Sequence, residues 1–125
     1  MLLGTKKFSI IIFSDNHKKL AEWYEKTLEL KINDHIDMPH EHFIGFDFGG
    51  LFFSIGHHGK VKGKSKDPYR MMIGFDVRSV NKTYEKLVKK GVYFIAKPFE
   101  APPGGYWCMT ATDPEGNILQ FFGGK

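Results

Sequence analysis

The chain has 125 residues, of which 42% are hydrophobic and 26% are charged. This length is enough for one domain with its own core, and the composition is that of an ordinary globular protein. No apolar run approaches the ~18 residues of a membrane span, and residues 1–9 lack a signal-peptide core. A single cysteine, Cys108, excludes an internal disulfide. We therefore expect a cytoplasmic protein that does not enter the membrane.

The formal net charge is +4, and the lysines are dispersed along the chain. The densest group lies in residues 59–67, which read GKVKGKSKD. This stretch is typical of a solvated loop, although it could also attract an anionic ligand. Because no groove-reading element accompanies the basic charge, we do not expect a nucleic-acid partner.

The first half of the chain predicts one strand, one helix and three further strands. Residues 6–14 form an Ile-rich apolar run, and Asp15 is a suitable N-cap for a helix over residues 16–30. Short strands are expected at 31–36, 42–48 and 51–58, the last two joined by Gly49-Gly50. The buried helix face would carry Leu20, Trp23, Tyr24, Thr27 and Leu28.

The second half repeats this order of elements. A strand is expected at 69–77, Ser79 would cap a helix over 80–90, and Gly91 would end it. Three strands follow, at 92–99, 106–112 and 118–122. An offset of 64 residues brings strand, cap and helix face into coincidence, so we interpret the chain as a diverged structural duplication.

Three segments carry a resemblance to a known family. They are residues 13–30 (FSDNHKKLAEWYEKTLEL), residues 72–77 (MIGFDV) and the turn DPEGN (113–117) before a short apolar strand. In this order the chain resembles the vicinal oxygen chelate superfamily, which includes glyoxalase I, bleomycin- and fosfomycin-resistance proteins and extradiol dioxygenases. The resemblance implies an α+β fold in which two βαβββ modules form curved mixed sheets around a cleft. Module 1 would span residues 1–58, the linker 59–68 and module 2 residues 69–125. It also implies a homodimer.

Metal-dependent members of that family place one ligand, usually His or Glu, on each of four strands. Counting from Asp15 and from the DPEGN turn, these positions fall here on Phe8, Ser54, Met72 and Gln120. A divalent ion requires carboxylate oxygens or imidazole nitrogens converging on one centre, which these four side chains do not supply. We therefore expect no metal cofactor at the usual place.

The resemblance then favours a metal-free protein that binds a small molecule, as drug-sequestering resistance proteins do. The basic charge favours a neutral or anionic, partly aromatic ligand. Gln120 would point into the cleft and exchange hydrogen bonds with that ligand. The predicted ligand-binding residues are Phe8, Ile10, Phe52, Ser54, Met72, Asp76, Trp107 and Gln120.

The alternative is an enzyme of the same superfamily, namely a lyase, isomerase or dioxygenase. Asp76, a strand carboxylate on the expected cleft side, could serve as its acid or base. A displaced metal site could instead use the histidines at positions 40, 42, 57 and 58, although exposed loop histidines are the commoner interpretation. Cys108 is expected to be a small buried residue rather than a nucleophile.

Overall fold

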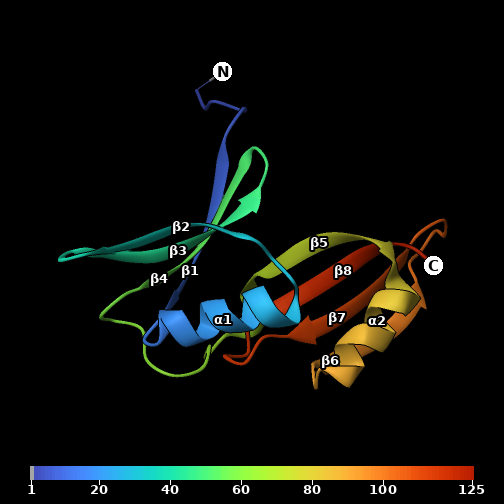
Figure 1. The fold of residues 1–125 in the computed structure, drawn as a ribbon. Coiled ribbons are helices and arrows are strands. Elements are labelled where there is room, and N and C mark those ends of the chain that lie inside the picture. Colours follow the sequence, from blue (N-terminus) through green and yellow to red (C-terminus); the bar gives the residue numbers. More distant parts are fainter. Residues whose placement is uncertain (1) are drawn as a thin grey trace. The chain divides into compact units, whose positions relative to one another are not determined.

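The computed structural model describes residues 2–125 and divides into two compact units after Gly63. Each unit consists of one helix and one four-stranded mixed sheet, in the order βαβββ (Figure 1). The α+β class and the two βαβββ modules predicted from the sequence are thereby confirmed. Within residues 2–125, neither helix is long and apolar enough to cross a membrane.

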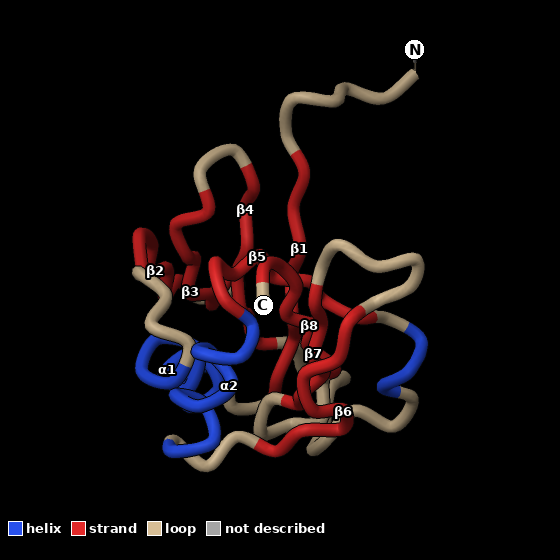
Figure 2. The backbone as a smooth tube through the Cα atoms, turned by 90° about the vertical axis from the view of Figure 1, so that its right-hand side faces the viewer, coloured by secondary structure: helices blue, strands red, loops and turns tan. Residues whose placement is uncertain are grey.

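The first unit contains four strands in the spatial order β1-β4-β3-β2, with β1 parallel to β4 and the other pairs antiparallel. Gly49 adopts a positive φ of 62° in the tight turn between β3 and β4, which only glycine enters without cost. Figure 2 follows this backbone from strand to strand. Its elements are β1 (Phe8–Ser14), α1 (His17–Thr27), β2 (Ile32–Met38), β3 (Glu41–Phe48) and β4 (Leu51–His57).

The core of the first unit lies between α1 and one face of its sheet. Tyr24 is fully buried, and its ring contacts those of Phe46 and Phe53 at 6.3 and 5.7 Å between centroids. Leu20 and Ala21 complete the buried stripe of the helix. Since side chains alternate along a strand, the neighbouring residues of β3 and β4 face the other way, and α1 leaves that second face of the sheet uncovered.

The second unit repeats the arrangement, with the strand order β5-β8-β7-β6. Its helix buries Val80 and Leu87. In its sheet the rings of Phe75 and Phe121 stack with their centroids 5.7 Å apart. Its elements are a 3₁₀ turn (Pro68–Arg70), β5 (Met72–Ser79), α2 (Val80–Lys89), β6 (Tyr93–Glu100), β7 (Trp107–Thr112) and β8 (Ile118–Gly124).

The predicted start and end of α2 are confirmed, but the predicted cap of α1 is wrong. Ser79 Oγ accepts a hydrogen bond from Lys82 N at 3.2 Å, and Gly91 follows the helix with φ 82°. In the first unit Asn16 Oδ1, not Asp15, accepts from Lys19 N. The Asp15 carboxylate instead accepts from Gly63 N at 3.2 Å. The correct offset between the halves is therefore 63 residues, from Asn16 to Ser79.

Candidate functional site: a pocket on the first sheet

A pocket of about 730 Å³ lies on the face of the first sheet that α1 leaves uncovered. β1 contributes Ile11 and Phe13, which are 48% and 42% exposed, and β4 contributes Phe52, which is 38% exposed. Phe43 from β3 contacts Phe52 edge-to-face at 5.9 Å. Four large apolar side chains thus remain in reach of a ligand on one side of a sheet, where water would otherwise cover them.

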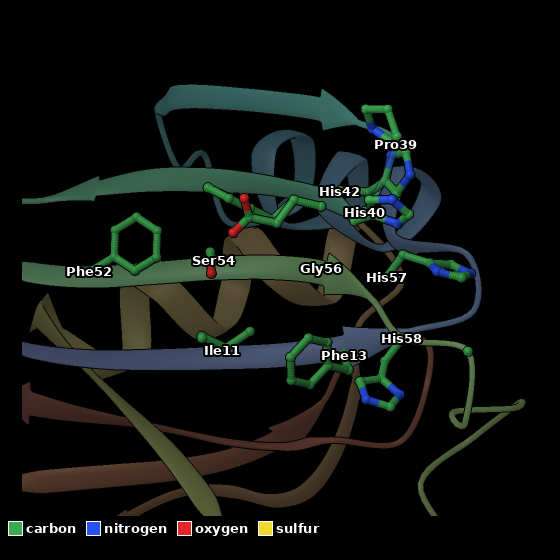
Figure 3. A pocket seen from close by; sticks show the side chains of 13 residues that line it. Ile11, Phe13, Pro39, His40, His42, Phe52, Ser54, Gly56, His57 and His58 are labelled. Carbon is green, nitrogen blue, oxygen red and sulfur yellow. The ribbon is translucent and has the colours of Figure 1, made fainter.

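One end of this pocket is rich in imidazole groups. His40, His42, His57 and His58 line it together with Pro39 (Figure 3), and Glu41 also lines the pocket. The ring of His58 contacts that of Phe13 at 5.2 Å in a T-shaped arrangement, which joins the apolar and the polar parts of the wall. Imidazoles donate or accept hydrogen bonds and carry positive charge when protonated, so this end suits an acceptor or an anion.

Small residues keep the middle of the pocket open. Ser54 is buried in the centre of β4, and Gly56 lies two residues further along the same face (Figure 3). A Cβ at Gly56 would lie only 3.2 Å from the carbonyl oxygen of His42, and 3.4 and 3.5 Å from Phe43 Cβ and the Phe13 ring. A larger residue there would therefore crowd the aromatic wall, and the Ser54 hydroxyl is a polar group between the two ends.

Of the four ligand-binding residues predicted in the first unit, the structure brings two together. Phe52 and Ser54 line the pocket, whereas Phe8 and Ile10 do not. In the parallel ladder Phe8 pairs with Leu51 and Ile10 with Phe53, so both belong to the face that carries α1. Phe8 does line a smaller hollow of about 510 Å³ at the start of β1, which it shares with Phe52.

The displaced cap explains this difference. Counting seven residues back from Asn16 rather than from Asp15 moves the first-strand position of the family from Phe8 to Ser9. A shift of one residue transfers every side chain of a strand to the other face. Ser9, Ile11 and Phe13 therefore share the pocket side of β1, and the pairing of Ser9 with Phe52 agrees with this.

In the second unit, three of the four predicted residues share one face. Gly74 pairs with Gln120 and Asp76 with Phe122, so alternation places Met72, Asp76 and Gln120 on the side opposite α2. Trp107 pairs with Gly123 and lies on the other face, where the Lys125 ammonium stands 5.1 Å from its ring. Cys108 is buried, as expected.

The donor atoms at the family's metal positions do not fit a divalent ion. With the corrected register, these positions carry the hydroxyls of Ser9 and Ser54, the thioether of Met72 and the amide of Gln120. Neutral hydroxyl, thioether and amide groups bind Mg²⁺, Zn²⁺ or Fe²⁺ weakly compared with carboxylate or imidazole. Elsewhere in residues 2–125, no group of three or more His, Cys, Asp or Glu side chains is arranged to hold a metal ion.

Sequence reasoning missed two parts of the site. The predicted set lacks Ile11 and Phe13 because the wrong cap places the odd-numbered residues of β1 on the helix side, and it also lacks Phe43 of β3. The sequence places His17 only within the predicted helix, but its ring lies 6.2 Å from that of His42 and 6.1 Å from that of His57. The contact between α1 and the ends of β3 and β4 leaves no local signal in the sequence.

With the fold and the pocket established, comparison with known proteins defines the class of the chain. Residues 8–121 match the model of the Glyoxalase/Bleomycin resistance protein/Dioxygenase superfamily. The match covers most of the chain, which therefore belongs to this superfamily. The resemblance inferred from the sequence motifs is confirmed.

Several solved structures share the fold. A glyoxylase/bleomycin resistance protein/dioxygenase domain from Frankia sp. EAN1pec aligns over 100% of both chains, with a TM-score of 0.77 and 20% identity. A superfamily member from Sphaerobacter thermophilus DSM 20745 covers 98% of this chain and 99% of its own, with a TM-score of 0.73 and 19% identity. TioX from Micromonospora sp. ML1 covers 98% and 100%, with a TM-score of 0.74 and 13% identity. No match was found among curated proteins.

Proposed function

We propose that the protein binds a small, partly aromatic, neutral or anionic molecule without using a metal ion. The observation that carries this proposal is the pocket on the first sheet, with apolar side chains at one end and imidazoles at the other. Its volume of about 730 Å³ lies within the range of ligand sites, which are mostly apolar with a few polar groups that fix orientation.

The two ends of the pocket suggest the chemistry of the ligand. Phe52 and Phe43 stand edge-to-face, so an aromatic ring could insert beside them at the centroid spacing such pairs prefer. Glu41 is the one carboxylate among the lining residues, against four histidines. A carboxylate or phenolate on the ligand would therefore find hydrogen-bond donors at that end, whereas a cation would find few acceptors.

Metal independence rests on the donor set. The four family positions carry neutral, weakly coordinating groups, so we derive no catalytic step through a metal ion. The enzymatic alternative retains Asp76, which is an exposed carboxylate on the face opposite α2. The pocket described here does not include Asp76, and we therefore favour binding over catalysis. We also propose that the protein is cytoplasmic and forms a homodimer.

A pair of probes that differ in charge tests the proposal. 1-Naphthoate and 1-naphthylmethylammonium share a ring system but carry opposite charges. Titrated into ¹⁵N-labelled protein at pH 7.5 with a chelator present, naphthoate should shift the amide resonances of residues 11–13 and 52–57. The ammonium probe should bind at least about tenfold more weakly, which corresponds to ~1.4 kcal/mol. Equal binding of both probes, or shifts confined to other residues, would contradict the proposal.

Two phenylalanine variants supply a matched control. Phe52→Ala removes a ring from the pocket wall, whereas Phe8→Ala removes a more exposed ring, 70% accessible, from the other face. Burying a Phe side chain is worth about 1.5–3 kcal/mol, so Phe52→Ala should weaken naphthoate binding about tenfold or more. Phe8→Ala should leave it unchanged. Metal analysis of protein purified without chelators completes the test, since one divalent ion per chain would refute metal independence.

A further inference from the structure

Three histidines from three separate elements meet at one end of the first unit. His17 is the first residue of α1, His42 lies on β3 and His57 ends β4. Their ring centroids are 6.2 Å apart for His17 and His42, 6.1 Å for His17 and His57, and 6.3 Å for His42 and His57. We call these three residues the histidine cluster.

His17 is the unusual member of the cluster. Its side chain is only 8% exposed, and its Nε2 atom is buried without a hydrogen-bond partner within the described part of the chain. Leaving a buried polar atom unpaired is unfavourable, so the position is not optimised for stability. A buried imidazole that has no acceptor for a second proton is held in its neutral form.

The groups that face His17 make protonation unfavourable. Burial, the neighbouring rings of His57 and His42, and the Lys18 ammonium lower the pKa of His17, and only the Asp37 carboxylate of β2 opposes them. Asp37 is already engaged, because it contacts His42 Nδ1 and pairs with Lys18 Nζ at 3.5 Å. The position of His17 in the first turn acts in the same sense, since the amino end of a helix disfavours positive charge.

The cluster also connects α1 to the ligand pocket. His42 and His57 line the pocket, and they contact the first residue of the helix that covers the other face of the sheet. We propose that the histidine cluster is a proton-operated switch. At neutral pH it holds the first turn of α1 against the ends of β3 and β4. In mild acid its members repel one another, and the helix start and the histidine end of the pocket loosen together.

This switch goes beyond the proposed function and does not depend on which ligand the pocket takes. Only protons are exchanged with solvent, and no covalent bond changes. His57 is exposed to solvent, and His42 contacts the Asp37 carboxylate, so both rings have surroundings that buried His17 lacks. A proton on buried His17 would lie about 6 Å from the rings of His42 and His57, on a side chain whose Nε2 atom has no partner within the described residues.

Nuclear magnetic resonance of the unliganded protein tests the switch directly. The ¹³Cε1–¹H signals of the six histidines are followed from pH 8 to pH 4.5 with EDTA present, and amide hydrogen exchange is measured over residues 17–24. His17 should titrate below the ordinary histidine pKa of 6.5. As it titrates, the exchange protection of the first turn of α1 should fall at least tenfold after correction for intrinsic rates. Protection that stays constant through that titration would overturn the proposal.

Variants separate the switch from general acid sensitivity. His17→Gln should remove the acid-induced loss of protection, whereas His35→Gln, an exposed histidine of β2 outside the cluster, should retain it. If His17→Gln does not fold, His57→Gln takes its place, because it removes a like charge at an exposed position and should shift the loosening to lower pH. A zinc ion that occupies the cluster in EDTA-free protein and blocks its titration would also refute the switch.

Discussion

Asn16 Oδ1 accepts a hydrogen bond from the backbone amide of Lys19 at 3.4 Å, and this contact starts α1. The neighbouring Asp15, which is also a good capping residue by type, is directed instead to Gly63 N. Counting back seven residues from Asn16 rather than from Asp15 changes the family's first-strand position from Phe8 to Ser9. Ser9 shares the pocket face of β1 with Ile11 and Phe13, whereas Phe8 and Ile10 lie on the side of the helix.

Substitution of the two candidate caps should distinguish them. Asn16→Ala removes an N-cap, which typically costs about 1 kcal/mol of unfolding free energy. Asp15→Ala removes an exposed contact to a loop amide and should cost less than half as much. Urea unfolding of both variants at pH 7.5 provides the comparison. A larger loss for Asp15→Ala would show that Asp15 is the functional cap.

Engineered histidine pairs test the register of β1. Ser9 pairs with Phe52 and Ile11 with Ser54, so Ser9 and Ser54 are diagonal neighbours on the pocket face. Ser9→His with Ser54→His should create a two-imidazole site for Ni²⁺, because diagonal neighbours in a sheet lie within reach of long side chains. Phe8→His with Ser54→His places the imidazoles on opposite faces and is the matched control.

The first pair should bind Ni²⁺ at least about tenfold more tightly than the control pair, a difference of ~1.4 kcal/mol. Isothermal titration at pH 7.5 measures both affinities, with the parent chain subtracted to account for its six native histidines. Tighter binding by the Phe8→His pair would instead restore the register counted from Asp15.

Local sequence signals were sufficient for the fold. The apolar run of β1, the helical stripe of Leu20 and Tyr24, and the glycines at the tight turns each act over a few residues and predict the right elements. The run of β1 also indicates a buried strand, whereas Ile11 and Phe13 are 48% and 42% exposed. The DPEGN turn and the repeated order of elements then identified the family. These features depend on backbone geometry and on burial, which a single sequence expresses directly.

The site was harder to predict from the sequence than the fold, because it depends on features for which the sequence allows two alternatives. Asp15 and Asn16 are both capable N-caps, and in the structure Asp15 accepts a hydrogen bond from Gly63 N, 48 residues away, while Asn16 caps the helix. Trp107 and Cys108 lie on opposite faces of β7. The pairing of Trp107 with Gly123 and of Cys108 with Phe122 shows which of the two shares the face of Gln120, and this pairing is not evident from the sequence. The histidine cluster joins α1, β3 and β4, so its members are far apart in the chain.

The DPEGN turn should be a major contributor to the stability of the second unit. Asp113 is 3% exposed, and its Oδ1 accepts from Glu115 N at 2.8 Å and from Asn117 N at 3.0 Å. Its Oδ2 accepts from Asn117 Nδ2 at 2.8 Å. Asp113→Ala leaves these donors unpaired and should lower the unfolding free energy by about 2–3 kcal/mol, measured by urea unfolding.

Two related variants apportion that loss. Asp113→Asn keeps the acceptor for both backbone amides but places an amide against Asn117 Nδ2, so its cost should be intermediate. Asn117→Ala removes only the side-chain donor and should cost least of the three. If Asp113→Ala proved no more destabilising than Asn117→Ala, the backbone hydrogen bonds of this turn would contribute little.

Acid should destabilise the first unit in two separate windows of pH. Burial and neighbouring positive groups lower the pKa of His17 in the folded state, so the unfolded chain binds the proton first as pH falls below 6.5. Stability present above that pH is then lost progressively. The pKa of Asp37 is also lowered, mainly by its bond to His42, so its contribution is lost only as pH falls below 3.8.

The unfolding free energy of the parent chain and of its variants, measured by urea unfolding at intervals between pH 8 and pH 2.5, should show the two windows separately. His17→Gln should flatten the upper window and leave the lower one in place. Asp37→Asn should remove the lower window, and it should enlarge the upper one, because the carboxylate is the one group that raises the pKa of His17. Asp34→Asn, in the same strand, serves as the control for loss of a β2 carboxylate. An upper window that shrinks in Asp37→Asn would contradict the electrostatic coupling between β2 and the start of α1, on which the histidine switch depends.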